Sequence, residues 1–287
     1  MIVVGLKGGL GNQLFQYALG RRLAMEQGCP LIIDDRALHS DPLRNYALNQ
    51  FQIAHPLAKP LSYPLHGLGT YLNPIYKALP FAQSLTIANE KGFAFDPQIL
   101  ESEGNIYLNG YWQSERYFLP LRQTLLEDLQ LAKPLNSEQS ALAQQITQTN
   151  AISLHIRRGD YVSDSTTHSY HGLCDLDWYM RAINAITQDI SKPHFYIFSD
   201  DYEWASQNLQ LSHPTHFIEP QKDGYESIDM YLMSLCKHNI IANSSFSWWG
   251  AWLNQNPHKR VIAPANWFAN APHDTRDLIP SSWQRLA

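Results

Sequence analysis

The sequence predicts an α/β protein built from two lobes with parallel, doubly wound sheets. Strand and helix patterns alternate along much of the chain, which is typical of a parallel sheet covered by helices. The 287 residues exceed one domain of about 100 to 150 residues and suit two. A new strand begins at Ala151 after a helical segment, so we place the lobes at residues 1–145 and 146–287.

The first lobe opens with a strand, a glycine-rich turn and a helix. Residues 1–6 form an apolar run, and apolar residues recur at helical spacing over 14–26. A second strand is predicted at 31–33, because the run ends in Asp34 and Asp35 as strands of α/β sheets often do. Residues 54–85 lack a clear period, so we assign them only to loops and short helices.

The second lobe shows the alternation more clearly. The predicted helices are 139–149, 177–189, 227–237 and one from about 247, and the predicted strands are 151–155, 194–198 and 239–242. Each strand is followed by a helix, so the strands should be parallel and their carboxyl ends should share one edge.

The bulk composition excludes several classes of protein. Hydrophobic residues make up 44% and charged residues 16%, which is too apolar for a disordered chain. The net charge of −5 gives no reason to expect nucleic acid or an anionic membrane as partner. The cysteines, which are Cys29, Cys174 and Cys236, form no C-x-x-C pair, so a zinc site or disulfide framework is not expected. The N-terminus lacks signal-peptide features and no apolar run reaches the ~20 residues of a membrane span, which favours a cytoplasmic location.

The turn after the first strand could approach a ligand with its backbone. Its glycines, which are Gly5, Gly8, Gly9 and Gly11, leave N–H groups uncovered where a helix begins. The segment is neither a G-x-G-x-x-G fingerprint nor a P-loop, and a purely structural turn is an equal alternative. Asn12 and Gln13 could cap the helix or reach into a cleft.

A pair of arginines follows the strand at 151–155. Arg157 and Arg158 should point in opposite directions on extended backbone, so one could bind a diphosphate while the other pairs with a carboxylate in the loop. Two solvated surface arginines are the alternative. Either way they stand at the edge where open α/β sheets bind ligands.

Polar residues also follow the next two predicted strands. Asp200 could accept hydrogen bonds from N1–H and the exocyclic amine of guanine, although helix capping by Asp is equally expected. Residues 243–247 place the hydroxyls of Ser245 and Ser247 at a helix start, where free N–H groups and the helix dipole favour a phosphate.

Two further patterns have simpler explanations. Trp248, Trp249 and Trp252 lie at helical spacing, and core packing explains them better than a sugar platform. A D-x-D sequence at Asp175 and Asp177 could hold a metal ion, but acidic residues directly before a helix are better explained as its N-terminal cap.

Taken together, five segments resemble the bacterial α-1,2-fucosyltransferases over nearly the whole chain. They are GGLGNQLFQYA at 8–18, GYWQSERYF at 110–118, HIRRGDY at 155–161, FSDD at 198–201 and IIANSSFSWWGAWLN at 240–254. The resemblance implies a GT-B-like architecture of two Rossmann-like lobes with an interlobe cleft, and GDP-fucose bound by the C-terminal lobe.

The resemblance also implies roles for individual residues. Arg157 corresponds to the arginine on the β-phosphate, with His155 beside it, and Asp200 to the acid that reads guanine. Ser245 and Ser247 correspond to the phosphate-binding hydroxyls, while Gly11 and Asn12 lie in the segment near the reacting sugar. The family inverts at the anomeric carbon without a metal, so no cofactor is expected and GDP-fucose is a substrate. The expected acceptor is a galactose-containing oligosaccharide or glycoconjugate, and the enzyme could work at the inner-membrane surface.

The general base is the least defined part of the predicted site. Asp164 is our candidate, with His168, His171 or no base at all as alternatives, and Asp160 could instead hold Arg158. The sequence assigns no acceptor-binding residue. Rival functions are a transferase for another GDP-sugar or another hydroxyl, and a non-catalytic glycan-binding protein.

Overall fold

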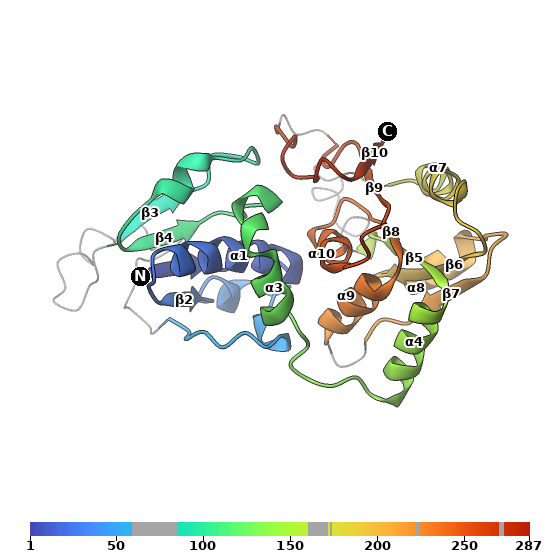
Figure 1. Ribbon diagram of the computed structural model, residues 1–287, viewed down its shortest axis with the longest axis horizontal. Coiled ribbons are helices and arrows are strands. Elements are labelled where there is room, and N and C mark those ends of the chain that lie inside the picture. Colours follow the sequence, from blue (N-terminus) through green and yellow to red (C-terminus); the bar gives the residue numbers. More distant parts are fainter. Residues whose placement is uncertain (59–84, 160–171, 173, 222–223, 270–272) are drawn as a thin grey trace. The chain divides into compact units, whose positions relative to one another are not determined.

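The computed structural model describes residues 1–58, 85–159, 172, 174–221, 224–269 and 273–287, and its chain divides into two compact units. Unit 1 comprises Met1–Gln130 with Arg276–Leu278, and unit 2 comprises Leu131–Thr275 with Ile279–Ala287. Figure 1 traces the elements of both units along the chain.

Unit 1 is built on a parallel sheet of four strands with the order β2-β1-β4-β3. The strands are β1 (Ile2–Gly5), β2 (Leu31–Asp34), β3 (Thr86–Asn89) and β4 (Ile106–Asn109). The helices are α1 (Leu10–Glu26), α3 (Arg122–Asp128) and the 3₁₀ turns η1 (Leu38–Ser40), η2 (Leu48–Gln50), η4 (Pro97–Glu101), η5 (Glu115–Tyr117) and η6 (Leu119–Leu121).

Helix α1 begins at Leu10, four residues before the predicted start at 14. Gly9 is extended and ends the turn, so the chain enters the helix directly after the glycines. Most residues of α1 are buried, including the polar Gln13 and Gln16. A helix that is covered on most sides shows no clean amphipathic stripe, which is why the apolar spacing indicated only its later part.

Unit 2 contains a parallel sheet of six strands with the order β10-β9-β8-β5-β6-β7. Its strands are β5 (Asn150–Ile156), β6 (Pro193–Ser199), β7 (Thr215–Ile218), β8 (His238–Ile240), β9 (Val261–Pro264) and β10 (Gln284–Leu286). Its helices are α4 (Ser137–Gln148), α7 (Leu176–Thr187), α8 (Tyr202–Asn208), α9 (Glu226–Leu235) and α10 (Ser245–Leu253). Every helix and strand predicted for the second lobe is present, and the predicted doubly wound α/β class is confirmed.

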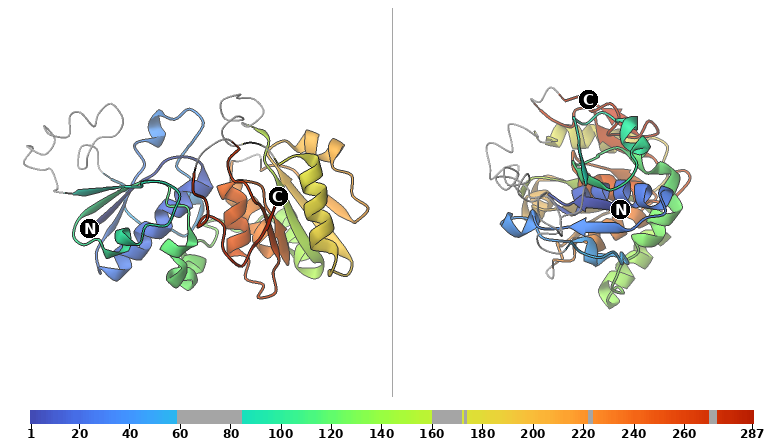
Figure 2. Two further views of the ribbon diagram at one scale, coloured as in Figure 1. Left: turned by 90° about the horizontal axis from the view of Figure 1, so that it is seen from above. Right: turned by 90° about the vertical axis from the view of Figure 1, so that its left-hand side faces the viewer.

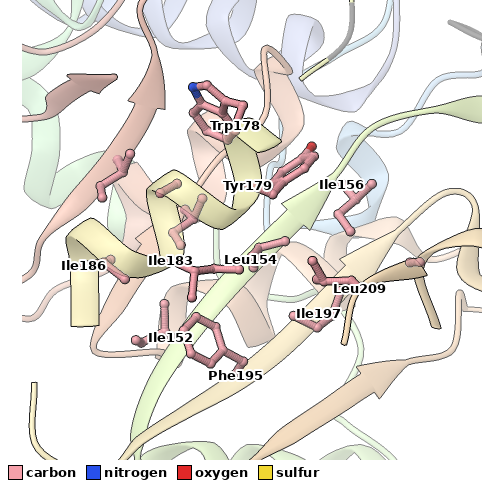
Figure 3. Packing of buried hydrophobic residues seen from close by; sticks show 14 residues of the cluster. Ile152, Leu154, Ile156, Trp178, Tyr179, Ile183, Ile186, Phe195, Ile197 and Leu209 are labelled. Atoms are coloured by element: carbon pink, nitrogen blue, oxygen red, sulfur yellow. The ribbon is translucent and has the colours of Figure 1, made fainter. Parts of the chain in front are cut away.

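Alternate residues of the central strands serve two cores, one on each face of this sheet. On one face, Ile152 and Leu154 of β5 pack with α7, and Figure 3 shows Ile183 and Ile186 of that helix directed at them. On the other face, Ala151 of β5 packs with Tyr196 and Phe198 of β6 and with residues of α4 and α9. The left view of Figure 2 shows helices on both sides of these strands.

The units differ from the predicted lobes in two places. Helix α4 contacts β5 and α9, so unit 2 begins at Leu131 rather than at 146. The short segment Arg276–Leu278 returns to unit 1 instead of staying with the C-terminal sheet.

Candidate active site

Unit 2 has the strand arrangement that binds ligands at one defined place. Numbered within the unit, its strand order is 3-2-1-4-5-6, as in dinucleotide-binding folds. The chain runs from β5 outward to β7 on one side and then from β8 outward to β10 on the other. Ligands of such sheets bind at the carboxyl ends of the two central strands, where the direction reverses. Here those strands are β5, followed by Arg157, and β8, followed by Asn243.

Both arginines after β5 are held by acids at the end of β6. The Arg157 Nη1 lies 2.9 Å from Asp200 Oδ2, and the Arg158 Nε lies 3.4 Å from Asp201 Oδ2. The Arg158 guanidinium also stacks over Trp204, with its carbon 3.7 Å from the ring centroid. The carboxylates seen to pair with them among the described residues come from the neighbouring strand end, whereas Asp160, the acid within the arginine loop, lies outside the described part of the chain.

The two acids play different structural roles. Asp201 is the N-cap of α8, because its Oδ1 accepts the Trp204 N–H at 3.2 Å. Asp200 Oδ1 instead accepts the backbone N–H of Arg158 at 2.8 Å. Helix capping, the alternative explanation for this acidic pair, applies to Asp201 and leaves Asp200 to hold the arginine segment.

His155 is a buried, neutral imidazole beside this ion pair. Its pKa is lowered to about 4, chiefly by burial, with Asp200 opposing the shift and Arg157 adding to it. Its ring lies 5.6 Å from that of Phe246 at the start of α10. Within the described part of the chain, its Nδ1 has no hydrogen-bond partner. A neutral ring can still offer one N–H to an anion without carrying charge itself.

The start of α10 lies on the other side of the reversal point. The helix begins at Ser245, two residues before the predicted start, and the side chain of its N-cap Ser244 makes no capping hydrogen bond. The first N–H groups of a helix have no carbonyl partner within it, and the dipole there favours an anion. Ser245 is half-buried, whereas Ser247 is buried and its hydroxyl donates to the Ser244 carbonyl at 3.3 Å. Ser245 is therefore better placed than Ser247 to meet a ligand.

The three tryptophans of α10 belong to the core, as predicted. Trp248 and Trp249 are fully buried, and Trp252 is 2% exposed. Trp248 and Trp252 stack at 6.2 Å.

Asn243 also belongs to this site, although the sequence pattern assigned it no role. Its Nδ2 donates to the carbonyls of Gly172 and Trp267, both at 3.3 Å, and its Oδ1 faces the Cys174 thiol at 3.9 Å. These contacts join the ends of β8 and β9 to the segment before α7. A cavity of about 250 Å³ adjoins Asn243 and is also lined by Asp175, Trp178, Arg181 and Asn266.

The D-x-D sequence is a helix start. Asp175 is the N-cap of α7, with its Oδ1 accepting the Trp178 N–H at 2.7 Å, and Asp177 lies in the first turn. The predicted capping role is thereby confirmed. Among the described residues, no group of three or more His, Cys, Asp or Glu side chains could hold a metal ion.

The predicted base and its alternatives follow Gly159 in the sequence. Asp160, Asp164, His168 and His171 lie outside the described residues.

In unit 1, Asn12 faces the end of β4. Its Oδ1 accepts a hydrogen bond of 2.7 Å from Gln113 Nε2, while Gly11 beside it is buried within the first turn of α1. Gln13 is fully buried and binds backbone on both sides: its amide donates to the Gly8 carbonyl, and its Oε1 accepts the Ala47 N–H. Neither side chain caps α1, whose N-cap is Gly9.

Solved structures of similar fold define the fold class of this chain. Fucosyltransferase NodZ from Bradyrhizobium superposes with a TM-score of 0.52 at 17% identity, covering 87% of this chain and 91% of that one. A second NodZ structure, an α-1,6-fucosyltransferase soaked with GDP-fucose, also has a TM-score of 0.52. With two parallel α/β sheets, the chain has a GT-B-like glycosyltransferase fold, which confirms the predicted fold class.

Sequence comparisons identify the family. The model of glycosyl transferase family 11 matches residues 91–287. An α-1,2-colitosyltransferase of Escherichia coli is 34% identical, covering 100% of this chain and 99% of its own. The E. coli O-antigen biosynthesis glycosyltransferase WbnK is 33% identical over 98% of this chain and 99% of its own. The galactoside 2-α-L-fucosyltransferase SEC1 of Bos taurus is 23% identical over 88% of this chain and 64% of its own. The chain belongs to glycosyl transferase family 11.

No helix among the described residues is both long and apolar enough to cross a membrane.

Proposed function

We propose that the protein transfers L-fucose from GDP-β-L-fucose to O2 of a galactoside, with inversion and without a metal ion. The observation that carries this proposal is the paired arrangement at the reversal point of unit 2. The Arg157–Asp200 ion pair follows β5 and the start of α10 follows β8, so a cation and a helix N-terminus flank the ligand position of the sheet. The name of the SEC1 relative supports a galactoside acceptor, and the colitosyltransferase relative supports an α-1,2 linkage.

The chemical demand of this reaction is to stabilise the departing diphosphate. In the proposed mechanism an acceptor hydroxyl attacks the anomeric carbon in line, while negative charge develops on GDP. Arg157 can meet that charge through its planar fork of donors, and the first N–H groups of α10 can add to it. Because Asp200 already orients Arg157, little reorganisation is needed when charge develops.

The remaining site residues receive proposed roles around this centre. His155 would donate to the β-phosphate as a neutral ring, Ser245 would add its hydroxyl, and Asp200 would also read guanine. Ser247, whose hydroxyl is bound to the Ser244 carbonyl, would contribute its backbone N–H in the first turn of α10. In unit 1, Asn12 and Gly11 would lie near the transferred sugar, and Asp164 would act as the general base. The three free cysteines support a reducing compartment such as the cytoplasm.

A second candidate donor follows from the relative at 34% identity, whose name specifies colitose. Colitose is L-fucose without the hydroxyl on carbon 3. A site that hydrogen-bonds this hydroxyl rejects the deoxy sugar by a large factor, on the order of 10⁴, whereas an apolar wall discriminates weakly. The donor preference therefore has to be measured with both sugars.

The deciding experiment combines nucleotide binding with a donor screen. The protein is titrated with GDP by calorimetry and then incubated with lactose and either GDP-fucose, GDP-colitose or GDP-mannose. We expect GDP binding, GDP release from GDP-fucose, and a new α-1,2 linkage in the product by NMR. Preferred release from GDP-colitose would instead select the second candidate. A protein that binds lactose and no GDP would be a glycan-binding protein, because such a protein has no use for a diphosphate site.

A further inference from the structure

The turn at the end of β4 is an unusual feature of unit 1. It comprises Gly110, Tyr111, Trp112 and Gln113, and we refer to it as the β4 turn. In the sheet order β2-β1-β4-β3, the chain continues from β1 to β2 on one side, whereas β4 lies on the other. The carboxyl ends of β1 and β4 are therefore the place where this sheet is expected to bind a ligand.

The backbone of the β4 turn is held in a costly conformation. Trp112 has a φ of +58°, in the left-handed region that side chains other than glycine rarely adopt. Glu90, directly after β3, accepts the N–H groups of Tyr111 at 2.6 Å and of Trp112 at 2.7 Å. Strained residues of this kind persist where surrounding contacts enforce them, and they concentrate at binding sites.

Two glycines let side chains fold over the strand ends. At Gly8, which has a φ of +78°, an added Cβ would lie 2.5 Å from Asn12 Nδ2. At Gly110, an added Cβ would lie 2.9 Å from Trp112 Nε1. The Asn12 amide thus lies against Gly8 in the turn after β1, and the Trp112 indole lies against Gly110 directly after β4. The hydrogen bond from Gln113 Nε2 to Asn12 Oδ1 joins the two ends.

Two polar atoms of this turn are buried and lack partners. Trp112 is 2% exposed and Gln113 is 7% exposed. Among the described residues, neither Trp112 Nε1 nor Gln113 Oε1 has a hydrogen-bond partner. Leaving a buried donor or acceptor unpaired costs free energy, so an unpaired atom in a native fold calls for an explanation. An unpaired donor and an unpaired acceptor on successive residues could be satisfied by one ligand.

Neighbouring hydroxyl groups of a sugar fit this pair of atoms. A hydroxyl both donates and accepts, so one can accept from the indole N–H while the next donates to the amide oxygen. A carboxylate or phosphate would suit the indole but would repel the amide oxygen. A neutral polyol is therefore the favoured class of ligand.

We propose that the β4 turn, together with Asn12, is the acceptor-sugar site of unit 1, with Trp112 Nε1 and Gln113 Oε1 binding neighbouring hydroxyls of the galactoside. This assignment rests on the proposed function. Both atoms are shielded from solvent, so binding requires the indole or the side chains around it to shift. Occupancy should consequently be visible at Trp112 itself.

A binding experiment can monitor the indole signal of Trp112 by itself. The chain has 8 tryptophans, and Trp112 is the single one before residue 131. With ¹⁵N-labelled tryptophan, the Trp112→Phe variant assigns the Trp112 indole signal by its disappearance. We expect a titration with lactose to shift this signal to saturation. An unmoved signal at lactose concentrations that support turnover would overturn the proposal, because a sugar bound to the Trp112 indole N–H must change the chemical shift of that group.

Kinetics then separate acceptor binding from a general loss of structure. Trp112→Phe removes the indole N–H and keeps a large ring, and Gln113→Met removes the amide at similar size. Each should raise KM for lactose about tenfold, the usual scale for one hydrogen bond. GDP affinity should stay within about twofold, because the proposed diphosphate site belongs to unit 2.

The matched control is Trp283→Phe, the same chemical change at a tryptophan of unit 2 that is 6% exposed. It should leave KM for lactose unchanged. An unchanged KM in both Trp112→Phe and Gln113→Met would contradict the proposed acceptor site while leaving the proposed function intact. A wild-type protein that releases no GDP from GDP-fucose would contradict the proposed function instead, and the lactose titration would then decide the site by itself.

Discussion

At the scale of single residues, Arg157 and Arg158 are adjacent and chemically alike, yet their surroundings differ. Arg157 pairs with Asp200 at 2.9 Å, whereas Arg158 pairs more loosely with Asp201 at 3.4 Å and stacks on Trp204. The first arrangement suits a guanidinium that is oriented toward a ligand. The second anchors the segment to α8.

This difference predicts that Arg157→Lys loses catalysis although the positive charge is kept. A lysine ammonium is a point charge and cannot reproduce the planar fork that meets a diphosphate. We expect kcat/KM for GDP-fucose to fall by about 10²-fold or more, the scale seen when one charge-stabilising donor is lost. Steady-state GDP release measures the effect. Near-normal turnover in this variant would remove Arg157 from the diphosphate site.

The neighbouring Arg158→Ala should act on stability instead. It removes the stacking on Trp204 and the ion pair with Asp201, which together anchor the segment after β5. A loss of about 1 kcal/mol corresponds to a fall in melting temperature of roughly 2 to 4 °C for units of this size. Thermal unfolding measures this shift. A variant of unchanged stability that no longer binds GDP would mean that the roles of the two arginines are reversed.

His155 predicts a specific pH dependence. Its pKa is lowered to about 4 in the folded protein, chiefly by burial, from an ordinary value of about 6.5. Between these values the unfolded chain binds a proton that the folded protein does not, so the stabilising contribution is complete above about pH 6.5 and is lost as the pH falls toward 4. The free energy of unfolding should decrease by about 2 kcal/mol from pH 7.5 to pH 5 on account of this residue.

Urea unfolding at both pH values, in wild type and in His155→Gln, isolates this term. The other histidines contribute equally to both proteins, so the variant should show a smaller decrease by about that amount. An equal decrease in the two proteins would mean that His155 titrates normally in the fold.

At the scale of elements, the sequence predicted unit 2 better than unit 1. Strands β5 and β6 are long buried runs, and the helix between them, α7, is amphipathic, so this part of the pattern was readable. Strand β3 has mostly exposed side chains and β10 has only three residues, so neither produces an apolar run. The β4 turn was noticed as a motif, but its left-handed Trp112 and its contact with Glu90 depend on tertiary packing that no local pattern contains.

The D-x-D element makes a clear prediction about metal dependence. Asp175 caps α7 through the Trp178 N–H, so the first acid of the sequence already has a structural partner. Activity should survive excess EDTA, and Asp175→Ala should cost about 1 kcal/mol of stability, the usual value of an N-cap. Assays with chelator and thermal unfolding test both statements. Activity that is lost with EDTA and restored by Mn²⁺ or Mg²⁺ would contradict this interpretation.

At the scale of the whole molecule, the sequence patterns predicted two lobes, but they did not predict that the C-terminal segment is divided between the two units. Composition and helix–strand alternation carry no signal for a short segment that joins the other unit. The segment Arg276–Leu278 belongs to unit 1 through contacts centred on one acid. Asp277 Oδ2 accepts the Phe95 N–H at 3.1 Å, Oδ1 pairs with Arg116 at 2.8 Å, and its carbonyl accepts the Ser114 hydroxyl at 2.7 Å.

These contacts predict that Asp277→Ala destabilises the protein through unit 1. The Asp277 side chain is 16% exposed, so its loss leaves the Phe95 N–H without this partner and should cost about 1 to 3 kcal/mol. Asp189→Ala is the matched control, because it breaks another Arg–Asp pair, with Arg260 at 3.2 Å, in which the acid is 82% exposed. That exposed pair should contribute at most about 1 kcal/mol. Urea unfolding followed by the ¹⁵N indole signal of Trp112 would report unit 1 directly. If the Asp277 variant unfolds at the same urea concentration as the Asp189 variant, the segment Arg276–Leu278 contributes nothing to unit 1 beyond chain connectivity.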